Sequence, residues 1–379
     1  MLVLGMLFYA CNEKDSGTGP KIPDPEDTLP HIDTIPMDTL EARNCAENPV
    51  VFTEYLIDPS LVKVVGEIGS VAAKTEIGGR SYIFPKDGQE GQRLLLKVPA
   101  DMRLTGIRHY KPLDAPAGYR PDWSLAFQVG CGIWLEVYHV KDISDSIKAL
   151  VDTTIYNSSA WQPLPGFGIK LKAGQTLGWY IPGPNAVSFD FIAHNDSITN
   201  QFVNQARYVA RNSNILDIVC PYDFFEPAKK AAYYALLGTG TGTQAPGASC
   251  GTPERDVIGT PAGQWFFDSG FVTAQPVLLK DGYYGEPLPL IIGADSTMLV
   301  GHIGPTDDFR IPRSNPTWKP LKDITTEWCY QAISFPPASA PEGWLWLKME
   351  TQTKMKVAYS PTGSCPSTFP TTGFKTYYR

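Results

Sequence analysis

Short apolar runs separated by Gly and Pro are the feature that most limits the folds open to this chain. Its 379 residues include 34 Gly and 34 Pro, and 12% are aromatic. Gly and Pro mark turns, whereas aromatic residues favour strands. The sequence therefore predicts a mainly β protein, and its length allows two domains or one large β domain.

Residues 49–237 predict a first β-rich domain. Strands are expected at 93–98, 125–129, 132–140, 168–171, 176–181 and 188–193. Residues 133–138 are apolar except for Glu136, which favours a strand buried on both faces. Short helices are expected at 143–151, from the helical spacing of apolar residues, and at 227–237, which begins with Pro and ends before Gly238.

A second β-rich domain is expected at 250–379. Residues 238–249 consist almost entirely of Gly, Thr, Ala and Pro, a composition typical of a linker. The strands expected after it are 264–267, 288–292, 297–301, 326–334, 343–350 and 353–358. Pro- and Gly-rich turns separate these runs, which predicts a small antiparallel barrel or sandwich.

The N-terminal residues differ from the rest of the chain. Residues 1–10 are apolar and precede Cys11, and residues 12–48 are polar and rich in Pro, Asp and Thr. Ten apolar residues are too few to span a membrane but suit a signal segment. The pattern resembles a bacterial lipoprotein signal. This resemblance implies lipidation of Cys11, a disordered tether at 12–48, and a protein held by lipid to a membrane of the cell envelope, on the outer membrane or cell surface.

The cysteines favour disulfides. Seven are present, and six remain if Cys11 carries lipid, an even number that fits an exported protein. Cys329 and Cys365 are expected to pair because both lie in the C-terminal third. Cys220 and Cys250 form the next expected pair because they bracket the linker. No CxxC motif or Cys/His cluster indicates structural zinc.

Residues 94–101, 104–107, 136–140 and 169–178 resemble sequences of the lysostaphin-type (LytM-like) zinc endopeptidases. The resemblance implies the fold of that family, the duplicated hybrid motif, for residues 49–237. Between two of its strands, Lys172 to Gly174 form a tight turn in which Gly174 can adopt positive φ. The zinc ligands of the family are not matched, since residues 79–82 (Gly-Arg-Ser-Tyr) and 188–191 (Ser-Phe-Asp-Phe) stand where they would fall. We therefore expect an inactive relative with no catalytic residues and no cofactor.

The remaining candidates for a metal site are His139, Asp190 and His194. Asp190 and His194 are four residues apart, so on a strand they share a face but lie about 13 Å apart. That distance is too long for shared ligation unless the chain bends. Zinc binding by these residues stays an alternative to a polar strand and loop without metal.

The second region resembles small exported β domains of unknown function. Its Gly263-Gln264-Trp265 sequence is also lipocalin-like, with Arg379 ending the last strand. A cation–π contact between Trp265 and Arg379 would close the base of a barrel. Trp344 and Trp346 share one strand face, so they form either a core pair or a platform that binds a ligand.

The net charge of −7 argues against a nucleic-acid partner, which requires a basic surface. The function expected from the sequence is that of a membrane-anchored exported lipoprotein that binds envelope glycan or a protein partner without catalysis. Alternatives are a divergent zinc-dependent peptidoglycan or peptide hydrolase, a binder of a small apolar ligand through the C-terminal barrel, and a structural subunit of a surface complex.

Overall fold

The computed structural model describes residues 49–69, 79–110, 122–151, 161–166, 168–183, 187–210, 215–238, 242, 249–265, 290–291, 311, 315–333 and 342–379. The expected signal with Cys11, the expected tether, most of the expected linker and the expected strand at 297–301 lie outside these residues. The described chain is mainly β and forms several sheets, which confirms the predicted fold class.

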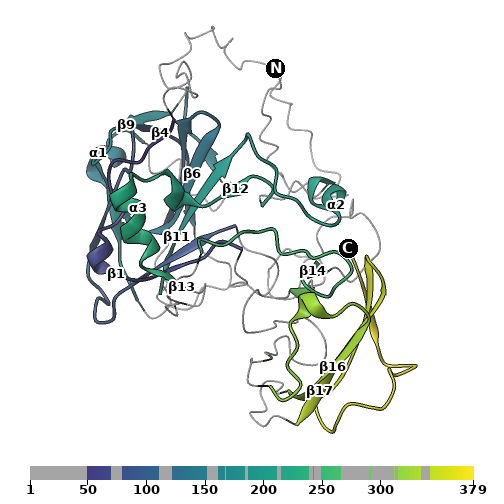
Figure 1. Ribbon diagram of the computed structural model, residues 1–379. Coiled ribbons are helices and arrows are strands. Elements are labelled where there is room, and N and C mark those ends of the chain that lie inside the picture. Colours follow the sequence, from purple (N-terminus) through teal and green to yellow (C-terminus); the bar gives the residue numbers. More distant parts are fainter. Residues whose placement is uncertain are drawn as a thin grey trace, which may run out of the picture. The chain divides into compact units, whose positions relative to one another are not determined.

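A sheet of ten strands forms most of the first region (Figure 1). Its path is β13–β1–β2–β11–β6–β5–β4–β8, with β12 paired to β11 and β9 to β4. Among the described strands of this sheet, β13 alone pairs in parallel, with β1. The strands are β1 (Val62–Gly66), β2 (Ser81–Pro85), β4 (Met102–Tyr110), β5 (Asp122–Gly130), β6 (Ile133–Val140), β8 (Gln162–Pro163), β9 (Ile169–Leu171), β11 (Phe189–Asn195), β12 (Ile218–Val219) and β13 (Leu237–Gly238).

A second sheet packs its apolar side chains into the same core. It has the order β3–β10–β7, with β3 at Leu94–Lys97, β7 at Asp142–Ile143 and β10 at Thr176–Tyr180. Leu96 and Leu177 of this sheet are buried in one cluster with Phe127 and Leu135 of the large sheet. Two sheets that share a core between them form a sandwich. The turn before β10 contains Gly174 at φ 80°, the positive φ expected there.

Side chains of the large sheet alternate between the core and an outer face. Phe189 and Phe191 of β11 are buried in the core, and Asp190 between them faces the other way. On β6, Trp134 and Glu136 are only partly buried. The expectation of a strand buried on both faces therefore holds only in part, because a small apolar cluster covers part of the outer face.

The helices are short. They are the 3₁₀ turns η1 (Pro59–Leu61), η2 (Pro221–Phe224) and η3 (Leu321–Asp323), and the α-helices α1 (Asp145–Lys148), α2 (Gln205–Ala210) and α3 (Pro227–Tyr234). Helix α3 begins at the expected Pro. Helix α1 is shorter than expected because Ile143 belongs to β7 and the Ser144 hydroxyl caps the helix by accepting from the Ile147 N–H at 3.4 Å.

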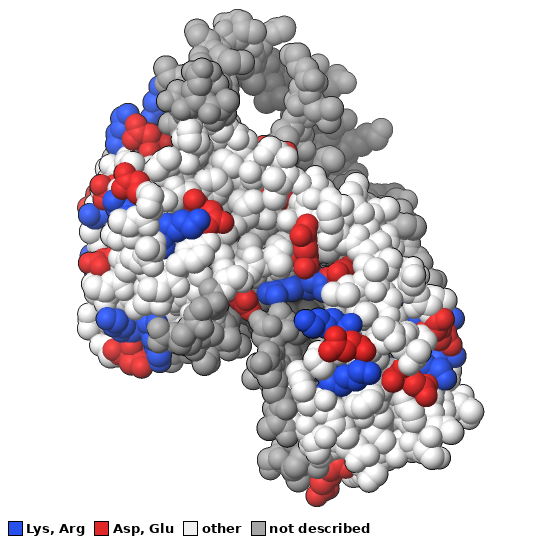
Figure 2. Space-filling model, viewed as in Figure 1, with Lys and Arg blue, Asp and Glu red and all other residues white. Residues whose placement is uncertain are grey.

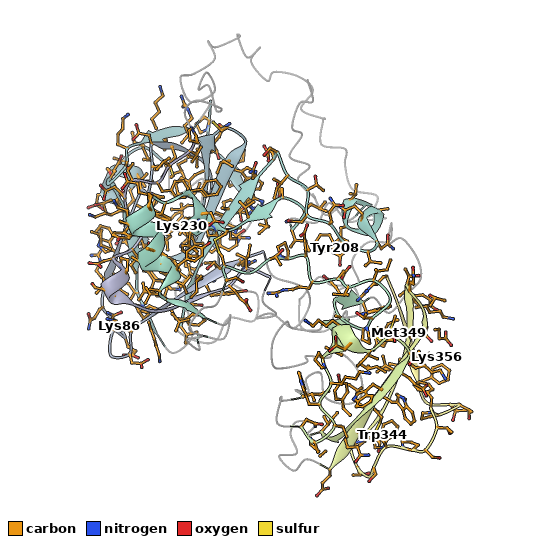
Figure 3. All side chains as sticks on the ribbon, in the orientation of Figure 1. Lys86, Tyr208, Lys230, Trp344, Met349 and Lys356 are labelled. Atoms are coloured by element: carbon orange, nitrogen blue, oxygen red, sulfur yellow. A yellow bond between two sulfur atoms is a disulfide. The ribbon has the colours of Figure 1, made fainter. Side chains whose placement is uncertain are left out.

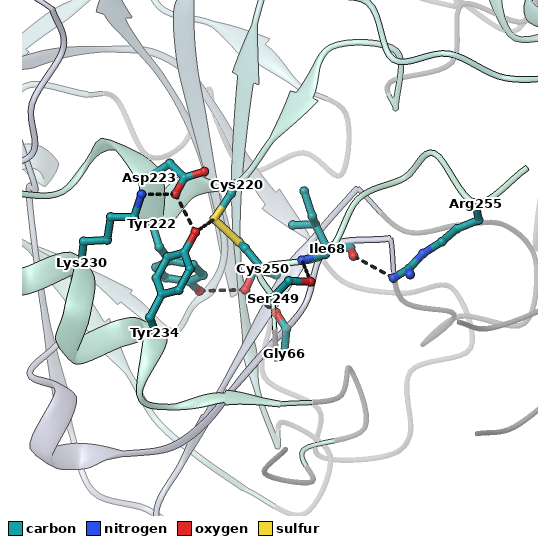
Figure 4. Close-up of a disulfide and its surroundings, with 12 residues drawn as sticks. Gly66, Ile68, Cys220, Tyr222, Asp223, Lys230, Tyr234, Ser249, Cys250 and Arg255 are labelled. Carbon is teal, nitrogen blue, oxygen red and sulfur yellow. Dashed lines mark hydrogen bonds and ion pairs between the residues drawn. A yellow bond between two sulfur atoms is a disulfide. The ribbon is translucent and has the colours of Figure 1, made fainter. Parts of the chain in front are cut away.

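The Cys220–Cys250 disulfide joins the start of η2 to the chain that follows the expected linker (Figure 4). Its Cα atoms are 5.9 Å apart. The Ile68 N–H donates to the Cys250 carbonyl at 2.8 Å, so the disulfide lies beside the end of β1. Cys329 and Cys365 form a second disulfide. Both are pairings expected from the sequence, and Cys131 is disulfide-bonded as well.

The second region has a four-stranded antiparallel sheet with the order β16–β17–β18–β19. Its strands are β16 (Glu327–Ile333), β17 (Gly343–Thr351), β18 (Lys354–Ser360) and β19 (Lys375–Tyr378), and β14 (Gln264–Trp265) pairs with β15 (Leu290–Ile291) separately. One face of the sheet is covered by a filled core that includes Trp265, Tyr330 and Tyr377. Among the described residues β16 and β19 end the sheet without pairing with each other, so the sheet is open there.

Arg379 lies over the ring of Trp265, with its guanidinium carbon 4.1 Å from the ring centroid. The expected cation–π contact is therefore present. The guanidinium also donates to the carbonyls of Val257, at 3.0 Å, and Ala262. These contacts tie the C-terminus to the start of the second region. No helix among the described residues is long and apolar enough to cross a membrane.

Candidate functional site

Two arginines and two aromatic rings stack on the outer face of the large sheet. The guanidinium carbons of Arg80 and Arg108 lie 4.8 and 5.2 Å from the ring centroid of Tyr138. Arg108 also lies 5.0 Å from the ring of Trp161, and the centroids of the two rings are 6.0 Å apart. We call these four residues the arginine–aromatic stack.

Strand register assembles this stack from distant parts of the chain. Arg108 on β4 pairs with Ser124 on β5 and donates to its hydroxyl at 3.2 Å. β4 also pairs with β8, and the register Ile107 to Gln162 places Trp161 beside Arg108. A Cβ at Gly106 would lie 3.6 Å from the ring of Trp161, an ordinary van der Waals contact, so the indole lies directly against β4.

Two carboxylates, one buried and one half-buried, hold Arg80 and Tyr138 in place. Asp190 accepts from the Arg80 guanidinium at 2.9 Å, and its side chain is 2% exposed. Burial opposes the charge of Arg80, but the nearby Asp190 holds the pKa of that guanidinium above its ordinary value. The Tyr138 hydroxyl donates to Glu136, and burial followed by the charge of Glu136 raises the pKa of Tyr138. Both groups therefore stay protonated at neutral pH.

A second polar group adjoins the stack through His139. The Asp122 carboxylate bonds His139 Nδ1 and Lys141 Nζ, each at 2.9 Å. His139 Nε2 lies 3.8 Å from the carboxylate of Asp190. Burial works against ionisation of Asp122, but the hydrogen bonds and charges of its two partners outweigh it and hold the pKa of Asp122 below its ordinary value.

A β-bulge turns His139 toward this group. Tyr138 and His139 together lie opposite the single residue Ser124 of β5. His139 has φ 66°, a left-handed conformation that is unfavourable for a residue with a side chain. The bulge places the rings of both residues on the outer side of β6, beside Asp190.

The three residues suggested for a metal site do not meet at one point. His139 Nδ1 bonds Asp122, and His139 Nε2 lies 3.8 Å from Asp190, so the two carboxylates lie on opposite sides of the ring. His194 bonds Asp217 at 2.8 Å and stacks on Trp134 at 3.5 Å between ring centroids. The structure thus brings His139 and Asp190 together and leaves His194 elsewhere. In the part of the chain that is described, no three His, Cys, Asp or Glu side chains form a group that could hold a metal ion.

Charges on the described surface are balanced by near neighbours. Acidic and basic side chains are interspersed on the face drawn in Figure 2. Ion pairs join Lys63 to Asp87 at 2.9 Å and Arg93 to Asp142 at 2.8 Å. A ligand of this surface would therefore be held by shape and hydrogen bonds more than by net charge.

The stack is not predictable from the sequence. Of its members, Arg80 lies in residues 79–82, which the sequence singles out only as a mismatch to zinc ligands. Its members are separated by more than twenty residues each, and no local spacing relates them.

Trp344 and Trp346 lie together on the outer face of β17 and are 8% and 7% exposed.

The fold and the site define a disulfide-bonded, mainly β protein with a fixed polar and aromatic surface. The chain matches no protein-family model and no curated protein.

Proposed function

We propose that this protein is an exported lipoprotein, anchored through Cys11, that binds an envelope glycan without catalysing a reaction on it. The observation that carries the proposal is the arginine–aromatic stack. Arg80 is held by Asp190, Tyr138 by Glu136 and Arg108 by Ser124, so ordering these three side chains on binding would cost little entropy.

A stack of this kind suits a sugar. Aromatic faces contact the C–H groups of a sugar ring, and guanidinium and carboxylate edges hydrogen-bond its hydroxyls. Trp161 is partly exposed and borders Arg108, so the face of the indole ring lies beside the hydrogen-bond donors of the guanidinium group. Few polar groups in fixed positions beside aromatic surface are typical of ligand sites.

The disulfides support the proposed location. Disulfides persist in oxidising compartments outside the cytoplasm and are rare inside it. The lipid anchor is supported by the sequence around Cys11. We expect labelled palmitate to be incorporated into the full-length protein in a bacterial host and not into its Cys11→Ala variant. Equal labelling of both would reject the anchor.

Glycan binding is tested with full-length protein in detergent and insoluble peptidoglycan as the first probe. Trp161→Ala should weaken binding about tenfold, which corresponds to about 1.4 kcal/mol for one lost ring contact. The control is Arg93→Ala, which removes an arginine stacked at 4.0 Å on Trp179 of the small sheet. Failure of the wild type to bind peptidoglycan or any glycan of an array would reject the proposal, as would unchanged binding by Trp161→Ala.

A second candidate function is the binding of an extended protein segment beside β3. This strand ends the three-stranded sheet of the described residues, and its Leu95 is 37% exposed, although the Lys97 N–H of the same strand already donates to the Leu56 carbonyl at 2.8 Å. A cavity of about 380 Å³ lies there, lined by Leu95, Lys97 and residues 54–58 and 61. Peptides commonly add to such sheet edges. A partner that co-purifies from envelope extracts with wild type and Trp161→Ala, but not with Leu95→Asp, would favour this function.

A further inference from the structure

The outer face of the sheet in the second region carries an aromatic cluster that is closed by a loop. Trp344, Trp346 and Ala358 form the sheet side of this cluster. Residues 361–374, which we call the flap, cover it with Phe369 and Phe374. The centroid of Phe369 is 5.9 Å from that of Trp346 and 5.8 Å from that of Phe374. Figure 3 shows the side chains of this sheet, with Trp344 and Lys356 labelled.

The flap is held at few points. Cys365 near its start is bonded to Cys329 of β16, and β19 follows its end. Every flap residue is described, and no backbone–backbone hydrogen bond joins the flap to the rest of the described chain. Its two phenylalanine rings pack on the aromatic cluster, and Lys348 and Lys356 of the sheet lie over them at 5.4 and 4.5 Å from the ring centroids. Segments with few backbone hydrogen bonds and few buried contacts open at low free-energy cost.

The covered cluster contains a hydrogen-bond donor without an acceptor. Trp346 Nε1 is buried and has no partner within the described structure. Buried polar groups are nearly always hydrogen-bonded, so each exception requires an explanation. A ligand that replaces the flap rings and brings an oxygen atom would satisfy this N–H.

The chemistry of the cluster limits the ligand. The two indoles are two residues apart on one strand, so their faces can contact adjacent rings of a chain-like ligand. The lysines at the edge already have acidic partners, since Lys348 pairs with Glu327 at 3.2 Å and Lys356 pairs with Glu350. A charged ligand would therefore gain little, whereas a neutral sugar offers apolar faces and hydroxyl acceptors together.

We propose that the flap is a lid over a binding site for a neutral oligosaccharide. Trp344 and Trp346 stack on sugar rings when the flap is displaced, and Trp346 Nε1 donates to a sugar hydroxyl. The disulfide Cys329–Cys365 keeps the displaced flap beside the site. This site is separate from the arginine–aromatic stack, and the proposal does not rest on the function proposed above.

Two variants test the lid and the donor separately. Phe369→Ala/Phe374→Ala removes the rings that close the flap. The apparent dissociation constant rises when only a small fraction of molecules is open, so this variant should bind about fivefold more tightly than its parent. Trp346→Phe keeps an aromatic ring but removes the N–H, and should bind about tenfold more weakly.

The measurement is isothermal titration calorimetry on the full-length protein in detergent. Cellotriose, maltotriose and tri-N-acetylchitotriose serve as probes. All variants carry Trp161→Ala, so that binding at the arginine–aromatic stack is weakened equally in every comparison. The control is Trp328→Phe, which removes an indole N–H that already donates to the Thr317 carbonyl at 2.9 Å. This control should bind the sugars as its parent does.

The proposal is overturned if none of the three sugars binds the open-flap variant while its circular dichroism spectrum matches that of the parent. It is also overturned if Trp346→Phe binds a sugar as tightly as the parent. If the open-flap variant fails to fold, the comparison of Trp346→Phe with its parent decides alone. Loss of peptidoglycan binding by Trp161→Ala concerns only the other site, so failures of the two proposals are distinguishable.

Discussion

Removal of the Cys220–Cys250 disulfide should destabilise the first region without affecting the second. The two cysteines are 30 residues apart in sequence. Closing a loop of this length lowers the entropy of the unfolded chain and contributes about 4 kcal/mol to stability. Cys220→Ala/Cys250→Ala should therefore lower the free energy of unfolding by about that amount, because the unfolded chain regains this entropy.

Differential scanning calorimetry of the full-length protein measures the effect. If the two predicted domains unfold separately, two transitions are expected, and the first should move down by about 10 °C for a region of this size. The matched control is Cys329→Ala/Cys365→Ala, whose cysteines are 36 residues apart and lie wholly within the second region. It should move only the second transition. A loss below about 1 kcal/mol, or an equal shift of both transitions by either variant, would refute this reasoning.

Three further predictions concern single residues. The pKa of Asp122 lies below its ordinary value, so the ionised carboxylate stabilises the fold above about pH 4, and this stabilisation is lost as the pH falls through the folded pKa. Urea unfolding should therefore show that Asp122→Asn lowers the free energy of unfolding by about 3 kcal/mol at pH 7 and by much less in acid. Arg379→Leu removes two hydrogen bonds and the contact with Trp265, and should lower the stability of the second region by about 2 kcal/mol. The second calorimetric transition should therefore move to lower temperature, and an unchanged transition would contradict this. In urea unfolding, Gly168→Ala should lower the free energy of unfolding by more than about 2 kcal/mol, because residue 168 has φ 80° and the new Cβ would lie 2.1 Å from a backbone oxygen. The control Gly88→Ala, at φ 82° with open space around the residue, should lower it by only about 1 kcal/mol.

Strands with strong local signals were predictable from the sequence. The expected ranges at 93–98, 132–140 and 343–350 each overlap an observed strand. Strands β1 and β2 were not expected, although they pair with each other and β2 alternates between buried and half-buried residues. Each also pairs with a strand that follows more than a hundred residues later, and those pairings cannot be predicted from the local sequence.

The candidate sites were less predictable than the strands. The arginine–aromatic stack depends on the register of β4, β5, β6 and β11, which no single segment determines. The bulge at His139 is equally invisible in sequence, since a His at positive φ has no compositional signal. For Trp344 and Trp346 the sequence left core and platform open. Their burial depends on a flap that lies fifteen or more residues further along the chain.

The Cys220–Cys250 disulfide also determines what a protease can release from this protein. The bond connects Cys220 in the first region to Cys250 at the beginning of the second, and both cysteines are buried in the core of the first region. A single cut at any peptide bond between the two cysteines leaves both fragments in one covalent molecule. Such cleavage would leave the apparent mass unchanged on a gel run without reductant, and two fragments would separate only after reduction. Endogenous nicking of this segment would therefore not shed the second region from the first.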